Sequence, residues 1–503
     1  MLNEKTPLRI MKFGGTSLAD ASCIKNVVEI IVAASQEGSL VVVVSAMAGV
    51  TNELIHAATL SERGEWDATE KTLEKLQHQH ETALDSLINS VEERYRLRRK
   101  IQELFQEGIR LCQGTMLLGE LTARVRDGVS SLGERLSAPL IAACLAARGI
   151  ACEAIEATEL IVTDSYHGAA DPRMDPTSER CEARLRPLFK KGIVPVVTGF
   201  IGATEEGTLT TLGRGGSDYS ATILGAVLDA EDVVIWTDVD GLQTADPRIV
   251  PGAPTIPEVS YREAAELAYF GAKVLHPKTL RALMECGIPV WIRNSFTPER
   301  PGTKITQIGP SDGAGTRGLA AIADAALITL AGPCLAEAPE VLVRTLNATA
   351  AVRADVLLVS QSSAQNEVCL VVSASQAKRT VEALHHEFAQ ELAHQKTDHI
   401  NLDPHVSIVT AVGQNIGRLP GTFGRLFAAL SRENINVIAI AQGAARHKIS
   451  FVVEKKNLRA TVATAHREFQ LDTLNLQAAA VDNSAKRPTG FQLDSAISMA
   501  QAD

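Results

Sequence analysis

The chain has 503 residues, of which 45% are hydrophobic and 21% charged, and its formal net charge at pH 7 is −10. This length and composition predict a soluble protein of about three domains, and the negative charge argues against general nucleic-acid binding. The sequence has no apolar run long enough to span a membrane and no apolar signal-peptide core in residues 1–9, so we expect no membrane association and predict a cytoplasmic location.

The cysteines suggest neither a disulfide framework nor a metal site. All eight are scattered, with no Cys-x-x-Cys pair and no cluster with histidine. We therefore expect reduced, mostly buried thiols and no metal held by the protein alone. The basic run at 94–100 lies in helical sequence and is interpreted as a solvated helix face.

The first informative segment is KFGGTS at 12–17, which follows a short apolar strand. The N–H groups of a glycine turn can point at an anion with no Cβ in the way, and a helix N-terminus adds to the attraction. Lys12 supplies a positive charge beside Gly14 and Gly15. The lysine precedes the glycines, so the segment fits neither a Walker loop nor a dinucleotide fingerprint, and a plain strand-to-helix turn is the alternative.

The next stretches predict the fold class. Residues 68–126 are rich in Glu, Leu, Gln and Arg and should be mostly helical. Short β-branched runs between helical stretches predict buried strands at 40–45, 193–198, 232–237 and 288–292. This alternation is typical of an α/β fold with a mainly parallel sheet covered by helices on both faces.

A second glycine run, LGRGGSD at 212–218, stands directly before a predicted helix. It has the same physical features as the first, with the Asp218 carboxylate as the charge beside it. Two such turns in one chain favour a phosphate-binding site over two unrelated loops.

After a Gly- and Pro-containing linker at 305–317, the chain repeats one pattern of strand, helix, strand, turn and strand. The strands of the first copy are predicted at 326–330, 356–361 and 367–373. The second copy has strands at 406–412, 436–442 and 448–454, with a helix at 421–433.

Four motifs in this order resemble those of aspartate kinases: KFGGTS at 12–17, TTLGRGGSDY at 210–219, WTDVDG at 236–241 and FGAKVLHP at 270–277. The resemblance implies an amino-acid-kinase-like three-layer αβα fold over residues 1–309. An aspartate-binding lobe would occupy about 1–195 and an ATP-binding lobe about 196–309, with the active site between them.

The repeat resembles the paired ACT domains that regulate aspartate kinases, most closely those of bifunctional aspartokinase/homoserine dehydrogenases. It implies α+β ACT-like domains at 318–400 and 401–480, followed by a tail at 481–503, and association into a homodimer or homotetramer through them. The last fifty residues hold no dinucleotide fingerprint, so a monofunctional kinase is expected.

The resemblance implies ATP-dependent phosphorylation of the β-carboxylate of L-aspartate to 4-phospho-L-aspartate, the first step of lysine, threonine and methionine biosynthesis. Mg²⁺ would accompany ATP and be held mainly by its phosphates, although Asp238 and Asp240 could contribute. The alternative is a catalytically silent amino-acid sensor, which the retained charged residues disfavour.

The resemblance also assigns residues. The catalytic pair would be Lys12 and Asp218. Substrate binding would fall to Ser45, Thr51, Glu134, Arg214, Gly215 and Ser217. ATP would contact Lys12, Gly14, Gly15, Ser17, Thr237, Asp238, Arg248 and Lys273. An amino-acid effector, threonine or lysine, would contact the allosteric residues Gln361 and Gln442. A guanidinium suits an α-carboxylate and an acid suits an ammonium, although Glu134 could instead be an ordinary first-turn helix acid.

Overall fold

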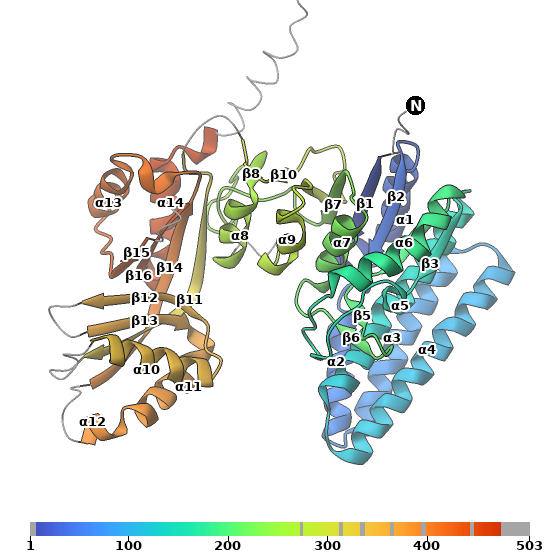
Figure 1. Ribbon diagram of the computed structural model, residues 1–503, viewed down its shortest axis with the longest axis horizontal. Coiled ribbons are helices and arrows are strands. Elements are labelled where there is room, and N and C mark those ends of the chain that lie inside the picture. Colours follow the sequence, from blue (N-terminus) through green and yellow to red (C-terminus); the bar gives the residue numbers. More distant parts are fainter. Residues whose placement is uncertain are drawn as a thin grey trace, which may run out of the picture.

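The computed structural model describes residues 7–271, 275–310, 315–331, 338–362, 367–393, 399–442 and 447–473 (Figure 1). Within these ranges, no helix is both long enough and apolar enough to cross a membrane.

An eight-stranded sheet with the order β3-β4-β2-β1-β7-β9-β10-β8 organises the first part of the chain. All neighbouring strands are parallel except β9 and β10. The strands are β1 (Leu8–Phe13), β2 (Ser39–Val44), β3 (Cys152–Ile155), β4 (Val194–Thr198), β7 (Asp232–Thr237), β8 (Glu258–Ser260), β9 (Val290–Asn294) and β10 (Thr303–Thr306). A separate hairpin consists of β5 (Ile201–Ala203) and β6 (Leu209–Thr211).

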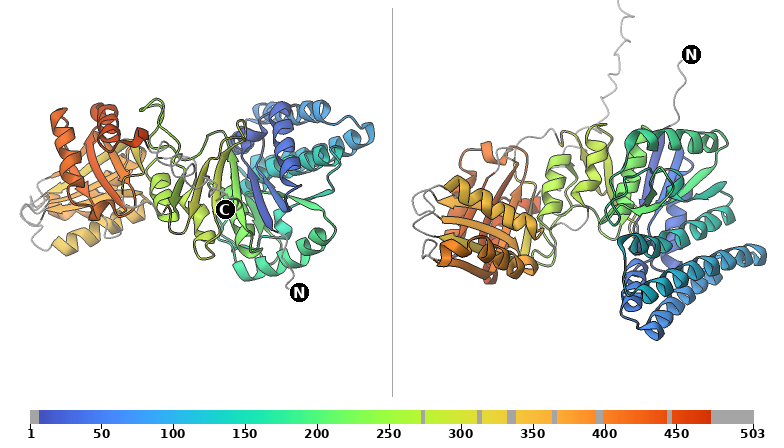
Figure 2. Two further views of the ribbon diagram at one scale, coloured as in Figure 1. Left: turned by 90° about the horizontal axis from the view of Figure 1, so that it is seen from above. Right: turned by 60° about the horizontal axis from the view of Figure 1, so that its bottom comes forward.

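Helices cover both faces of this sheet, as Figures 1 and 2 show. Along β1, Met11 and Phe13 pack into one core while Ile10 packs into the other, as the two-residue period of a strand requires. The core with Phe13 includes α1 (Ala21–Ala34), α2 (Val50–Glu62), α3 (Trp66–Leu87), α4 (Val91–Leu118) and α5 (Ala123–Ala147). The core with Ile10 includes α6 (Met174–Lys190), α7 (Gly216–Val227), α8 (Tyr261–Tyr269) and α9 (Pro277–Met284). The predicted helical stretch at 68–126 is confirmed.

A second, wholly antiparallel sheet has the order β12-β13-β11-β14-β16-β15. Its strands are β11 (Gly318–Ala331), β12 (Val356–Ser362), β13 (Glu367–Ser373), β14 (His399–Val412), β15 (Ala439–Ala441) and β16 (Lys448–Glu454). The helices are α10 (Ala338–Ala351), α11 (Ala374–Glu387), α12 (Ala389–Ala393), α13 (Thr422–Arg432) and α14 (Leu458–Glu468). The two repeats therefore share one sheet through the long pair β11 and β14. The sequence pattern did not predict α11 and α12 in the first repeat or α14 in the second.

The second sheet packs against the end of the first part, where α8 contacts β11 and β14. Lys448 Nζ on β16 lies 2.8 Å from Glu266 Oε2 on α8, and Leu319 N on β11 donates to Thr244 O at 2.7 Å. The predicted linker at 305–317 is shorter than expected, because Ile305 and Thr306 complete β10.

Candidate active site

A cavity of about 790 Å³ opens at the carboxyl ends of β1, β2 and β7. The chain order reverses in the sheet between β1 and β7, since β2 and β4 lie on one side of β1 and the later strands on the other. Open α/β sheets bind ligands at such a reversal, beyond the carboxyl ends of the strands. Lys12, Ser45 and Thr237 come from these strand ends and all line the cavity.

The central charge pair of the cavity joins β1 to α7. Lys12 Nζ lies 2.5 Å from Asp218 Oδ1, and the two side chains are only 9% and 13% exposed. The geometry of such a buried ion pair is set by the packing around it, whereas ion pairs between exposed side chains often form without a fixed geometry. The structure thus brings together the two residues predicted to be catalytic.

The second glycine run forms the turn into α7, as predicted. Gly215 has φ 67 and is the N-cap, a conformation in which a side chain would be strained. A Cβ on Gly216 would lie 2.6 Å from the ring of Phe200. The turn therefore requires glycine, and it presents the first N–H groups of α7 at the cavity beside Asp218.

The first glycine run differs from its prediction. Gly14 and Gly15 line the cavity, but the turn leads into a short 3₁₀ segment, Gly15–Leu18, and α1 begins only at Ala21. The Asp20 carboxylate caps α1 by accepting from two backbone N–H groups. The N-terminus of α1 is therefore already capped and is not available to an anion at this turn. What the turn offers to a phosphate is its glycine backbone and the Lys12 ammonium.

Glu134 reaches the cavity because α5 packs closely against the loop after β2. A Cβ on Gly133 would lie 2.5 Å from Ala46 Cβ, so only glycine permits this approach. Glu134 is 3% exposed, and its Oε2 has no hydrogen-bond partner in the described part of the chain. Burial raises the pKa of Glu134 to about 8, partly opposed by the Ala46 N–H and by Lys12.

The other predicted substrate residues, Ser45, Thr51, Arg214, Gly215 and Ser217, also line the cavity. Arg214 is exposed and has no ion-pair partner among the residues that the structure describes. A second exposed arginine, Arg126 at the start of α5, lines the cavity as well. Two guanidinium groups are therefore available to an anionic ligand.

The predicted nucleotide residues are only partly brought together. Thr237 and Asp238 line the cavity beside Gly14 and Gly15. Ser17 does not line it and is hydrogen-bonded to Ser295, with 2.7 Å between the hydroxyl oxygens. Arg248 is exposed outside the lining and pairs with Asp246. Lys273 lies outside the described residues.

The carboxylates near the nucleotide residues do not form a metal cage. Asp240 accepts hydrogen bonds from Asn294 and Thr297 and pairs with Arg300, so it ties neighbouring loops together. Within the described ranges, no group of three or more His, Cys, Asp or Glu residues could hold a metal ion.

Two cavity residues with unusual environments, Asp127 and Phe200, were not predicted from the sequence. Phe200 has φ 69, a left-handed conformation that is costly for a bulky side chain and is common at functional sites. Asp127 precedes Glu134 by two helical turns, so the helical period could have indicated it. Phe200 directly follows Gly199 at the end of β4, and this place at a strand end is the only sequence feature that could have indicated it.

The predicted allosteric residues lie far along the chain, on the second sheet. Gln361 is exposed on β12, and Gln442 is exposed directly after β15. These strands are the two outer members of the sheet order, and they contact each other. The corresponding positions of the two repeats therefore lie on, or directly after, two strands that contact each other.

Comparison with known families identifies the fold. Residues 7–294 match the amino acid kinase family, and residues 328–388 and 409–469 match the ACT domain. The chain belongs to the amino acid kinase family, and the predicted fold class is confirmed.

Within that family, the relatives place the chain among the aspartokinases. It is 31% identical to the chloroplastic aspartokinase 1 of Arabidopsis thaliana over 474 residues, covering 93% of this chain and 81% of that protein. It is 35% identical to the chloroplastic bifunctional aspartokinase/homoserine dehydrogenase 1 of the same plant over 479 residues, covering 93% of this chain. The chain spans about half the length of that bifunctional relative.

Solved structures agree. Escherichia coli aspartokinase III in complex with aspartate and ADP is similar with a TM-score of 0.77 and 28% identity, over 92% of this chain and 99% of that one. The same enzyme in complex with lysine and aspartate gives a TM-score of 0.75 and 29% identity over the same shares.

Proposed function

We propose that the protein is an ATP-dependent L-aspartate kinase that transfers the γ-phosphoryl group of ATP to the β-carboxylate of aspartate, giving 4-phospho-L-aspartate and ADP. The observation that carries this proposal is the single cavity that holds the Lys12–Asp218 pair, Glu134 and Arg214 at the reversal point of the sheet. Its position among the aspartokinases supports the same reaction.

The reaction needs charge neutralisation and alignment more than a strong base, since an ionised carboxylate is already a nucleophile. A β-carboxylate oxygen bonds to the γ-phosphorus while the bond to the bridging oxygen of ADP breaks. Lys12 neutralises charge on the transferred group, and Asp218 holds the Lys12 ammonium in place through their 2.5 Å contact. The N–H groups at the start of α7 are donors for the same oxygens.

Aspartate would be held by its α-amino and α-carboxylate groups. We assign the α-carboxylate to Arg214, which has no protein counter-ion in the described ranges, and the ammonium to Glu134, whose Oε2 has no partner there. Because burial raises the pKa of Glu134 to about 8, this acid is protonated at neutral pH without ligand. The arriving ammonium favours the carboxylate, so Glu134 releases its proton on binding.

The nucleotide would lie toward Thr237 and Asp238, with its phosphates near Gly14 and Gly15. Mg²⁺ would enter with ATP. In the described ranges Asp238 belongs to no group of three or more possible metal ligands, which fits a cation that keeps most of its ligands from phosphates and water better than it fits a protein cage. Arg248, Ser17 and Lys273 remain proposed nucleotide contacts.

We also propose that the ACT pair binds an amino-acid effector, threonine or lysine, at Gln361 and Gln442, and that it joins chains into a homodimer or homotetramer. Lysine is bound in the related Escherichia coli structure. The reaction would open lysine, threonine and methionine biosynthesis. Several relatives are chloroplastic, so a cytoplasmic location remains a prediction.

Hydroxylamine trapping tests the activity. With Mg-ATP and L-aspartate, the acyl phosphate should give a coloured hydroxamate in proportion to the ADP released, and L-glutamate should give little. Lys12→Met provides the matched inactive protein. A wild-type signal no higher than that of a reaction without aspartate would contradict the proposed function.

A further inference from the structure

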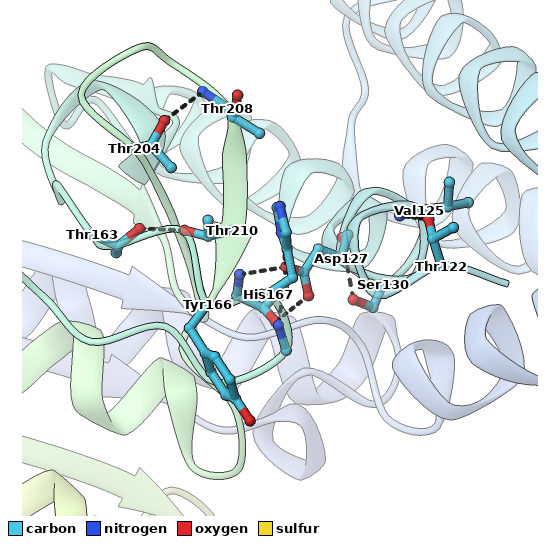
Figure 3. Close-up of polar contacts among 12 residues, drawn as sticks. Thr122, Val125, Asp127, Ser130, Thr163, Tyr166, His167, Thr204, Thr208 and Thr210 are labelled. Carbon is cyan, nitrogen blue, oxygen red and sulfur yellow. Dashed lines mark hydrogen bonds and ion pairs between the residues drawn. The ribbon is translucent and has the colours of Figure 1, made fainter.

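Two carboxylates of α5 line the cavity two helical turns apart, but their environments are opposite. Glu134 has a buried oxygen without a partner, whereas Asp127, only 1% exposed, is fully occupied. Its Oδ2 accepts from His167 Nδ1 at 2.8 Å, from Gly168 N at 3.1 Å and from Thr211 N at 3.3 Å. Its Oδ1 accepts from Thr211 Oγ1 at 2.6 Å. Figure 3 shows His167 turned toward Asp127.

These hydrogen bonds join three separate segments at the cavity wall. Asp127 belongs to α5, Thr211 ends β6 just before the glycine turn that carries Arg214, and Gly168 is the tip of the segment 163–172. Gly168 and Thr211 both line the cavity. A Cβ on Gly213 would lie 3.1 Å from Gly168 O, so the tip also touches the Arg214 turn directly.

The base of the segment is closed by its own contacts. Thr163 and Pro172 form an antiparallel bridge, and the Asp164 carboxylate accepts from Tyr166 N and Asp171 N. At the tip, by contrast, the His167 ring Nδ1 and the Gly168 backbone N–H both donate to the Asp127 carboxylate. Asp127 is therefore the group that fastens the tip to α5.

We propose that Asp127 is a positioning residue for the amino-acid end of the cavity, holding the 163–172 tip and Thr211 so that Arg214 and Glu134 face one bound substrate. This inference rests on the proposed function. Asp127 itself does not bind the ammonium, because four donors already occupy its two oxygens. It fixes the distance between Arg214 and Glu134, which do bind the substrate.

The kinetic test compares Asp127→Asn with a structural control. An amide nitrogen would face donors that need an acceptor, so the tip and Thr211 should separate from α5. We expect KM for aspartate to rise about tenfold or more while KM for ATP stays within about twofold. The control is Asp232→Asn. In wild type the Asp232 carboxylate accepts from Arg9 at the end of β7 opposite the cavity, so its loss should not change KM for aspartate.

A second pair of variants covers the case in which Asp127→Asn folds poorly. His167→Ala removes one of the four donors and should raise KM for aspartate less than Asp127→Asn does. His167→Asn restores a donor near the place of Nδ1 and should return KM toward the wild-type value. Equal KM values in His167→Ala, His167→Asn and wild type would overturn the role of this contact.

Amide hydrogen exchange supplies a readout that needs no substrate. Asp127→Asn should speed exchange at Gly168 and Thr211, whose N–H groups donate to Asp127, but not in β1. Unchanged exchange overturns the inference, and so does faster exchange with an unchanged KM for aspartate, which would make Asp127 merely structural. An inactive wild type would overturn the proposed function instead, and the exchange data would still decide whether Asp127 fastens the tip.

Discussion

The Lys12 ammonium and the Asp218 carboxylate meet at 2.5 Å across the point where the strand order reverses. Lys12 lies on the central strand β1, and Asp218 lies in the first turn of α7. Each residue is placed by a different half of the first part of the chain. The pair therefore forms only when β1 and α7 have packed together, which couples the geometry of the proposed catalytic pair to the fold.

Removing one or both charges of this pair should affect catalysis and stability differently. Lys12→Met should lower kcat by roughly 10²–10³, the usual cost of removing one group that stabilises transition-state charge. It also leaves Asp218 buried without its partner, at a cost of about 3 kcal/mol. The double variant Lys12→Met/Asp218→Asn should be more stable than Lys12→Met but equally inactive, as measured by urea unfolding and ADP release. Lys25→Met, on the exposed side of α1, is the control.

Arg214→Ala should raise KM for aspartate and leave KM for ATP nearly unchanged. Loss of a charged partner from a bound ion pair costs about 2–5 kcal/mol, which is roughly thirtyfold or more. Arg126→Ala is the informative comparison, because Arg126 also lines the cavity. A larger aspartate effect in Arg126→Ala, or a rise in the nucleotide KM with Arg214→Ala, would show that the α-carboxylate assignment is wrong.

Glu134 should make aspartate binding depend on pH. Since its pKa is raised to about 8 by burial, kcat/KM for aspartate should increase with pH up to about 8 in wild type. Calorimetry at pH 7 in two buffers of different ionisation enthalpy should detect release of one proton per aspartate bound. Glu134→Gln should bind weakly and release none. Proton-independent binding in wild type would contradict an acid that is neutral before ligand arrives.

The same pKa predicts a change in stability. A raised pKa means that the folded state holds a proton which the unfolded state has lost, so the contribution of Glu134 is full below pH 4.5 and is lost as pH rises to about 8. Urea midpoints at pH 6 and 8.5 should therefore differ more in wild type than in Glu134→Gln. Equal differences would indicate that Glu134 is ionised in the folded protein.

The sequence was sufficient for those parts of the site that depend on local pattern. Lys12 and Thr237 stand at the ends of apolar β-branched runs, and Gly215 precedes a helix, so strand ends and a helix start could be predicted. The helical period of α11 is also present in the sequence, since Ala377, Thr380 and Leu384 are buried on one face. The predicted pattern of strand, helix, strand, turn and strand does not include this helix.

Other features depend on contacts between distant segments. The partners of Asp127 come from 167–168 and 211, and Phe200, whose φ is left-handed, lies against α7, where its N–H donates to Ser220 Oγ. Local pattern does not encode which loops meet. The same reason explains Ser17, whose motif position indicated phosphate but whose hydroxyl contacts Ser295, which directly follows β9.

The two glutamines that are proposed to bind the effector are exposed. Gln361 and Gln442 occupy corresponding positions, but the residues after them differ: Ser362-Ser363 in the first repeat and Gly443-Ala444 in the second. The second repeat therefore lacks the two hydroxyl groups that follow the glutamine of the first repeat. Each neutral hydrogen bond that is lost in this way costs about 0.5–1.5 kcal/mol of affinity. We expect weak threonine inhibition that Gln361→Ala abolishes and Gln442→Ala reduces less. Full activity at saturating threonine without a shift in Tm would exclude threonine, and the same assay with lysine tests the other effector.

The second repeat contacts the part of the chain that is proposed to bind the nucleotide. His466 on α14 is 2% exposed, and its Nε2 lies 2.9 Å from Thr244 Oγ1, while its Nδ1 lies 3.3 Å from Asp472. Thr244 belongs to the loop that continues to Arg248, and Arg459 Nη1 donates to Arg248 O at 3.2 Å. Burial lowers the pKa of His466 from its ordinary value of 6.5, and Asp472 opposes this in part.

A depressed histidine pKa favours the neutral ring in the folded state, so the stabilising contribution is full above pH 6.5 and is lost as pH falls through the folded pKa. Wild type should therefore lose more stability between pH 7.5 and 5.5 than His466→Gln, which has no titrating group there, as measured by urea midpoints. His385→Gln, exposed on α11, should behave like wild type. Because the charged ring also disturbs the Thr244 loop, KM for ATP should rise over the same interval in wild type and stay flat in His466→Gln. Parallel pH profiles in wild type and His466→Gln would show that this contact does not link the second repeat to the proposed nucleotide lobe.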